Sequence, residues 1–369
     1  MKRMLVCLTA LWFVAQTADA GVQSVPKDYK PDRSWPVVVS TQDNPRGEVM
    51  KDTPFFVLHS GGQGVECSTK IESDLLALAA KYNIDPLRIY ATSFSRGGHE
   101  ILLQTADHPD WFAAIAPVDH DLRNNPASMK HVCFIRTPVL QLHGRGDMFR
   151  QTGKVLFDQM KEAGTPITWT DYAGGHDPRP IWDKTPKVWM SFFAKHVLNP
   201  YPKKIEHEAT HKRYGRAYWL DITVSKDAGG LNAAVAVSVE PNNVISVKST
   251  EDVAGLDLYL TDKLVDMKKP VKVVEGEKVL FEGPVAEKIT VKIREGTASA
   301  KKERPALWEQ LTAAGKKANF EYKPIDLAAI VEALPDTMPP VAPATPKPAA
   351  TTQPTSKPAS KPVDAGKAP

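Results

Sequence analysis

The chain has 369 residues, too many for one ordinary domain and few for three, and its 42% hydrophobic and 24% charged residues are typical of a globular protein. The formal net charge is only +4, from 47 basic and 43 acidic side chains. This balance excludes the strongly basic or acidic composition that would point to nucleic acid or an anionic membrane as the main partner.

The first twenty residues are predicted to be a cleaved secretory signal. Residues 1–3 are basic at two positions, residues 4–15 are nearly all apolar, and residues 18–20 give a small-x-small ending. The apolar run is shorter than the ~20 residues that span a bilayer, so an uncleaved anchor is the less favoured alternative. We therefore expect an exported protein, periplasmic or extracellular, without a transmembrane segment. In that oxidising setting Cys67 and Cys133 are free to pair, and the sequence leaves open whether they do.

Between Trp35 and about Leu198, short apolar runs alternate with longer amphipathic ones. The short runs indicate buried strands, and apolar residues at helical spacing indicate helices between them. This alternation predicts an α/β domain over residues 21–200, with a mainly parallel sheet covered on both faces. The expected strands lie at residues 37–39, 55–58, 88–91, 113–116, 139–142 and 167–169.

From about residue 214 the pattern changes to short β-type runs separated by turn signals. No long helical pattern intervenes, so residues 201–300 are predicted to form a small, sandwich-like all-β domain. Residues 301–334 are predicted to supply one or two closing helices. Residues 335–369 hold ten of the chain's 31 prolines, and they are predicted to form a disordered tail because they bury too little apolar area to offset their ordering entropy.

The segment with the clearest chemistry is Ser93-Phe94-Ser95-Arg96-Gly97, which follows an expected strand and precedes an expected helix. That context is typical of a nucleophile elbow, a turn so sharp that the residues two before and two after the nucleophile must be small. Ser93 and Gly97 meet this demand, although glycine is usual at the first of these positions. Ser95 is thus the predicted nucleophile, and the N–H of Arg96 is the first predicted oxyanion donor.

A serine hydroxyl needs a base to take its proton, and in this arrangement an acid and a histidine follow at the ends of later strands. Asp147 and His176 each come after an expected strand and after glycine residues. His176 is predicted to be the general base, and Asp147 is predicted to orient its ring and stabilise the imidazolium. Asp119 and Asp121, which follow the preceding strand, are the alternative acids.

Residues 24–198 resemble the secreted α/β-hydrolases of the polyhydroxybutyrate-depolymerase and feruloyl-esterase group, and the catalytic domain of prolyl-oligopeptidase-type peptidases. The resemblance is carried by residues 82–90, the elbow, residues 111–118, residues 138–147 and Gly174-Gly175-His176. It covers about half the chain and implies an α/β-hydrolase fold followed here by the β domain. It is specific for the superfamily and says little about the substrate.

The second oxyanion donor is expected in the loop after the third strand of this fold, where relatives usually carry His-Gly-Gly. The run from His59 to Gly62 has that composition, but only one helix separates it from the elbow strand, so by counting it follows the fourth strand. The third strand is then residues 37–40, and Thr41 or Gln42 is predicted to supply the donor. His59 and its glycines then shape the pocket or turn the chain.

A second motif, His207-Glu208-Ala209-Thr210-His211, matches the zinc-protease pattern. That pattern binds metal when both histidines lie one turn apart on a helix. The neighbouring apolar residues do not repeat at helical spacing, so we expect no metal here, and no cofactor elsewhere in the chain.

The leading functional hypothesis is a serine esterase that forms an acyl-enzyme on Ser95, with polysaccharide-linked esters among the substrates left open. A serine peptidase of the prolyl-oligopeptidase type is the second hypothesis. Such peptidases usually carry an N-terminal propeller, and few residues here separate the signal from the first core strand. A non-catalytic binding protein on a hydrolase fold is the alternative from another class, permitted by the substituted oxyanion loop. We expect no nucleic-acid partner; the oligomeric state and the role of the β domain are left open.

Overall fold

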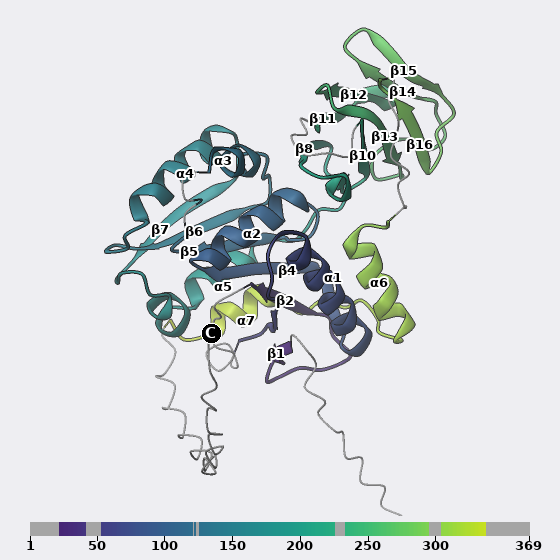
Figure 1. The fold of residues 1–369 in the computed structure, drawn as a ribbon. Helices are drawn as coiled ribbons and strands as arrows, with labels where there is room; N and C mark the ends of the chain where they lie inside the picture. Colours follow the sequence, from purple (N-terminus) through teal and green to yellow (C-terminus); the bar gives the residue numbers. More distant parts are fainter. Residues whose placement is uncertain are drawn as a thin grey trace, which may run out of the picture.

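The computed structural model describes residues 22–41, 53–120, 122, 125–225, 233–294 and 304–336. Figure 1 shows an α/β domain and, beyond it, a smaller domain built of strands. The predicted signal, Gln42, Asp121 and the predicted tail beyond residue 336 lie outside the described residues. Among the helices that are described, none is both long enough and apolar enough to cross a membrane.

A seven-stranded sheet forms the centre of the α/β domain, in the order β1-β3-β2-β4-β5-β6-β7. Neighbouring strands run parallel except at β1, which pairs antiparallel with β3 at the edge. All six strands expected from the sequence are present, and the predicted α/β-hydrolase fold class with a mainly parallel sheet is confirmed. The strands are β1 (Val22–Ser24), β2 (Trp35–Ser40), β3 (Phe56–His59), β4 (Ile84–Phe94), β5 (Ala114–Val118), β6 (Val139–Gly144) and β7 (Ile167–Tyr172).

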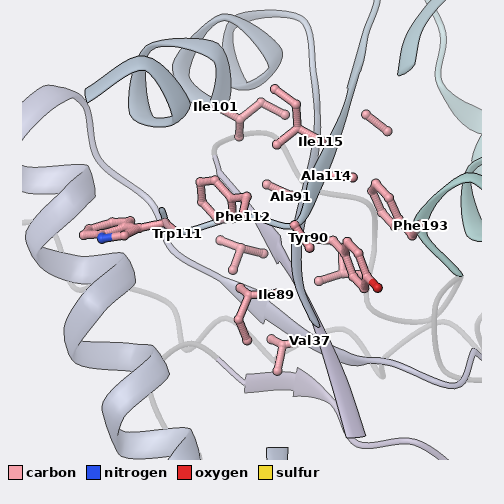
Figure 2. Packing of buried hydrophobic residues seen from close by; sticks show 14 of the residues in the cluster. Val37, Ile89, Tyr90, Ala91, Ile101, Trp111, Phe112, Ala114, Ile115 and Phe193 are labelled. Atoms are coloured by element: carbon pink, nitrogen blue, oxygen red, sulfur yellow. The ribbon is translucent and has the colours of Figure 1, made fainter. Parts of the chain in front are cut away.

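Helices cover both faces of this sheet, which is why strands β2, β5 and β6 are buried along their whole length. Figure 2 shows Ile101 and Phe193, from two different helices, on either side of strand β4. The ring of Phe193 stacks on Tyr90 of β4 with their centroids 4.6 Å apart, and both side chains are fully buried. The helices are α1 (Gly64–Lys81), α2 (Arg96–Asp107), α3 (Pro126–Val132), α4 (Arg150–Glu162) and α5 (Lys187–Ala194).

The β domain consists of two sheets that enclose a second apolar core, which includes Trp219, Val237 and Leu256. One sheet has the order β16-β13-β10-β9 and the other β15-β14-β12-β11-β8, and all pairs are antiparallel except β12 with β14. This is the sandwich-like arrangement that the sequence predicts. The strands are β8 (Lys204–Ala209), β9 (Arg216–Ala217), β10 (Leu220–Val224), β11 (Ala233–Glu240), β12 (Val244–Ser249), β13 (Val253–Tyr259), β14 (Val271–Glu275), β15 (Lys278–Gly283) and β16 (Lys288–Lys292).

After the β domain the chain returns to the α/β domain through two helices, α6 (Leu307–Lys317) and α7 (Leu327–Ala333). Figure 1 shows α6, in yellow-green, beside α1, and α7 close to α5. Leu311 and Leu327 are buried in the core of the α/β domain. The β domain is therefore tied to the α/β domain at both of its ends.

The fold differs in several places from what the sequence predicts; strand β1 and helix α3, for example, were not expected. Residues 204–209 form strand β8, which lies before the β-type pattern that begins at about residue 214. The first of these β-type runs, residues 217–224, is split into β9 and β10 by Tyr218, whose φ is 53°. Strand β15 was not predicted because it lies at a sheet edge, where its residues are all exposed or half-exposed and its sequence lacks alternation.

Candidate active site

Ser95 lies between the end of strand β4 and the start of helix α2, where the chain turns sharply. Its φ of 53° and ψ of −120° form a strained conformation that costs a non-glycine residue about 1–3 kcal/mol. The surrounding structure enforces it, since Ser95 N–H donates to Val118 O at 2.9 Å and Ser95 O accepts from His99 N–H at 3.2 Å. This geometry is the one that a nucleophile elbow requires.

Small residues flank this turn because the backbones on either side approach closely. A Cβ added to Gly98 would lie 2.9 Å from Cβ of His120 and 3.2 Å from the carbonyl oxygen of Ser93, so no side chain fits there. Ser93, which stands where glycine is usual, is fully buried, and its hydroxyl donates to the carbonyl of Thr41. The serine is accommodated because its hydroxyl finds an acceptor in the neighbouring loop.

The structure brings Ser95, His176 and Asp147 together in one hydrogen-bonded chain. Ser95 Oγ lies 3.0 Å from His176 Nε2, and His176 Nδ1 lies 3.0 Å from Asp147 Oδ1. The Asp147 side chain is completely buried, whereas 24% of the His176 side chain is exposed. These distances are those of a hydroxyl, a base able to take its proton, and a carboxylate able to stabilise the resulting imidazolium.

Backbone hydrogen bonds between the loop after β6 and the loop after β7 hold the acid and the histidine in place. Gly146 N–H donates to Gly174 O at 2.8 Å, and Arg145 N–H donates to Tyr172 O at 3.0 Å. A Cβ at Gly144 would lie 2.3 Å from Gly175 O, so the two loops meet only because this residue is glycine. Gly144, one of the glycines that the sequence places before Asp147, is therefore needed for this close approach.

Asp119, one of the two alternative acids, lies beside the triad but is bonded elsewhere. Its Oδ1 accepts from Gly144 N–H at 2.7 Å, and its Oδ2 accepts from the hydroxyl of Tyr172. One of its carboxylate oxygens lies within 4.8 Å of a carboxylate oxygen of Asp147 and of a ring nitrogen of His176. Burial raises the pKa of Asp119 to about 7, and the nearby charge of Asp147 contributes in the same direction, while the hydrogen bonds oppose it. The other alternative acid, Asp121, lies outside the described residues.

Two of the predicted oxyanion donors, Arg96 and Thr41, lie within the described residues. Arg96 is the first residue of α2, so its backbone N–H is one of the four at this helix end without a partner inside the helix. Thr41 follows β2, which pairs directly with the elbow strand β4. The Thr41 hydroxyl donates to Gly97 O at 3.0 Å, which fastens this loop to the elbow. Gln42, the other predicted donor, lies outside the described residues.

The glycine-rich run after β3 serves to turn the chain into α1. Gly62 has a φ of 111°, which favours glycine, and Gly64 is the first residue of the helix. Gly64 N–H donates to Glu100 Oε1 at 2.8 Å, and Gln104 Nε2 donates to Gly64 O at 2.9 Å, which fixes the run against α2. Of the two interpretations of this run, the structure favours the chain turn.

The zinc-protease pattern lies on strand β8 and the residues that follow it, not on a helix. Adjacent residues of a strand point to opposite faces, so His207 and Glu208 do not face one site. His207 Nε2 contacts the carbonyl of Tyr214, and Glu208 Oε2 lies 3.1 Å from Nδ1 of His131. The helical geometry on which this motif depends is therefore missing.

Cys67 and Cys133, whose pairing the sequence left open, are both free thiols. Cys67 is buried on α1, and burial raises the pKa of its thiol.

Apolar side chains surround the His176 ring, and no motif in the sequence predicted them. The ring centroid of Phe94 lies 4.5 Å from that of His176, and the centroid of Phe149 lies 5.2 Å from it. Trp182, on a short π-helix (Pro180–Lys184), packs against Phe94 at 6.4 Å. Met148, between Asp147 and Phe149, is 75% exposed. We call Phe94, Met148 and Phe149 the apolar rim; their places next to Ser95 and Asp147 in the sequence were the only available signal.

Known proteins are similar to parts of this chain. The "Putative esterase NocK" of Nocardia uniformis subsp. tsuyamanensis is 40% identical over 73 residues, which are 20% of this chain and 21% of that protein. No model of a known protein family matches the chain. Among solved structures, a thermostable esterase is 20% identical over 47% of this chain and 57% of its own, with a TM-score of 0.35.

Two further solved structures show likenesses of the same degree. A ferulic acid esterase is 16% identical over 42% of this chain and 83% of its own, with a TM-score of 0.35. The acylaminoacyl peptidase of Pyrococcus horikoshii is 14% identical over 48% of this chain and 41% of its own, with a TM-score of 0.40. The chain thus spans about a fifth of the curated relative and little more than half of the thermostable esterase. These similar proteins are esterases and a peptidase by name, and the sequence resemblance likewise named feruloyl esterases and prolyl-oligopeptidase-type peptidases.

Proposed function

We propose that this chain is a serine hydrolase that cleaves carboxylic esters through an acyl-enzyme on Ser95. The observation that carries the proposal is the chain of two 3.0 Å contacts from Ser95 Oγ to His176 and from His176 to the buried Asp147. The strained backbone of Ser95 supports it, because strain of this kind persists at functional sites.

In the proposed reaction, Ser95 Oγ attacks the acyl carbon while His176 Nε2 takes the hydroxyl proton. The oxyanion that forms accepts hydrogen bonds from the N–H of Arg96 and from a second donor in the loop at Thr41 and Gln42. When the tetrahedral intermediate collapses, His176 returns the proton to the leaving alcohol and the acyl group remains on Ser95. Water then attacks this ester, gives its proton to His176, and releases the acid as Ser95 regains its proton.

Esters are proposed ahead of peptides because of the apolar rim. Phe94 and Phe149 pack on the His176 ring, and the exposed Met148 extends the apolar surface into solvent. An apolar group next to the scissile bond would remove this surface from water, which is favourable. The rim therefore favours an ester with an apolar or aromatic acyl or alcohol group.

The proposal is tested with purified protein and a panel of p-nitrophenyl esters, feruloyl esters, acetyl-xylan and aminoacyl amides. We expect turnover of apolar esters that falls at least about a thousandfold in Ser95→Ala. The matched control is Ser73→Ala, which removes an exposed serine on α1 and should leave turnover unchanged. Equal turnover by the wild type and Ser95→Ala would refute the mechanism, and turnover of the amides alone would refute the preference for esters.

We also propose that the protein is exported, on the sequence of residues 1–20. N-terminal sequencing of the protein isolated from its native cells should then begin at Gly21. A mature protein that retains Met1 would contradict export through a cleaved signal.

A further inference from the structure

We propose that His143 is a positioning residue that holds the carboxylate of Asp147 in the orientation that His176 needs. The inference rests on the function proposed above and extends its hydrogen-bonded chain by one member. Asp147 Oδ1 lies 3.0 Å from His176 Nδ1 and also accepts a hydrogen bond from Phe149 N–H at 3.1 Å. His143 Nδ1 lies 3.1 Å from Oδ2, the oxygen that His176 does not use. The side chains of His143 and Asp147 are both fully buried.

The surroundings of His143 determine which of its ring nitrogens carries the proton. Gln141 Nε2 donates to Gly153 O at 2.9 Å, which fixes the amide with its nitrogen toward the helix, since a flipped amide would place two oxygens together. The same nitrogen lies 3.3 Å from His143 Nε2. Nε2 is therefore the acceptor, and the proton resides on Nδ1, where it is donated to Asp147.

His143 is neutral in this arrangement, as a donor to one side and an acceptor to the other must be. Burial lowers the pKa of His143, against the opposing effect of its hydrogen bond with Asp147. A neutral donor stabilises the Asp147 carboxylate without neutralising it, so the negative charge that faces His176 is kept.

Packing holds the His143 ring in a single position. The ring stacks on Trp169 with their centroids 4.7 Å apart and their planes 5° apart. Helix α4 also approaches the ring closely: a Cβ at Gly153 would lie 2.5 Å from His143 Nε2, so only glycine leaves room for the ring. A side chain with so little freedom fixes the direction of its hydrogen bond, and thereby the rotation of the carboxylate that accepts it.

Loss of the donor would leave Asp147 Oδ2 buried without the His143 hydrogen bond, next to Asp119. Such a carboxylate gains by rotating, and the rotation removes the oriented acceptor from His176. His143→Leu should then lower kcat for an apolar p-nitrophenyl ester by about 10- to 100-fold, with KM changed less than about twofold. His143→Asn, whose amide nitrogen can occupy the place of Nδ1, should recover most of the loss.

The decisive comparison makes the His143→Leu substitution in a protein that lacks the Asp147 carboxylate. If His143 acts only through Asp147, then His143→Leu should cost no further activity in an Asp147→Ala background. The rate at which a fluorophosphonate labels Ser95 serves as the second readout, because it remains measurable when turnover is slow. His120→Leu is the control: it removes a fully buried imidazole whose centroid is 5.6 Å from that of His143. It should leave kcat within about threefold of the wild type, and circular dichroism and thermal unfolding confirm that each variant is folded.

A loss of the same size in both backgrounds would overturn the inference in favour of a structural role. An Asn variant no better than the Leu variant, or a His143→Leu protein with wild-type kcat, would overturn it as well. These results are distinct from failure of the proposed function, which would appear as a wild-type protein without activity that depends on Ser95.

Discussion

Substitution of Gly153 by alanine tests whether the space beside His143 is required. Local helix preference predicts that the substitution raises the stability of the protein, whereas tertiary packing predicts that it lowers it. Gly153 lies inside α4, where alanine is favoured over glycine by about 1 kcal/mol. The added Cβ would, however, lie 2.5 Å from His143 Nε2 and 2.6 Å from Cε1, well short of the 3.4 Å at which ordinary contact begins. The ring or the helix must move to relieve this contact.

The expected cost follows from what that movement disturbs. Overpacking in a core costs about 1–3 kcal/mol, and loss of the hydrogen bond between His143 and the charged Asp147 costs a further 1.5–3 kcal/mol or so. After the helix preference is set against these, Gly153→Ala should destabilise the protein by about 1.5–5 kcal/mol. For a domain of this size each kcal/mol lowers the Tm by about 2–4 °C.

Gly315 supplies the matched control. It also lies inside a helix, α6, and a Cβ there would meet nothing within 4 Å. Gly315→Ala should therefore raise stability by about 0.5–1 kcal/mol. Thermal and urea unfolding of both variants give the comparison, together with kcat/KM, which should fall only in Gly153→Ala. A Gly153→Ala protein as stable and as active as the Gly315→Ala protein would refute the close packing around His143.

Three further predictions follow from the described contacts. Met148→Ser should raise KM for long-chain or aromatic esters severalfold and leave KM for acetyl esters unchanged, with the exposed Val155→Ser as control; equal effects on both esters would contradict the apolar rim. Asp119 has a pKa of about 7 in the folded protein against about 3.9 unfolded, so its contribution to stability should be lost as pH rises from about 4 to 7; urea unfolding of Asp119→Asn should lack this decline. Burial lowers the pKa of His131, which lies between the α/β and β domains, but its hydrogen bonds to Asp107 and Glu208 outweigh this effect and raise the pKa to about 9. Its stabilisation should be complete below about pH 6.5 and disappear as pH rises through 9, and a His131→Gln protein with the same pH dependence as the wild type would contradict this.

The parallel core of the fold could be predicted because its strands are buried on both faces and leave continuous apolar runs in the sequence. Strand β8 could not, because Glu206, His207 and Glu208 carry polar groups that look like a connection until their partners are known. Glu206 pairs with Arg136 of the α/β domain, and Glu208 pairs with His131. These partners are about 70 residues away in the sequence, and no local sequence pattern predicts them.

The residues of the candidate site also differ in how far the sequence predicts them. Ser95, Asp147 and His176 each follow a strand in a turn rich in small residues, so their order and spacing made them candidates. His143 also ends a strand, but its role depends on the stacking of Trp169 and on the space left by Gly153. Contacts of this kind bring together residues of three different elements, and they are specified by packing, which one-dimensional periodicity does not report.

The measurement that tests the central claim most directly is covalent labelling of the folded protein with a fluorophosphonate, read by intact mass and peptide mapping. The proposed mechanism predicts one adduct, on Ser95, that is absent in Ser95→Ala and forms far more slowly in His176→Ala, since the imidazole takes the hydroxyl proton across the 3.0 Å contact. A folded protein in which Ser95 remains unmodified, or is modified equally fast without His176, would contradict the account.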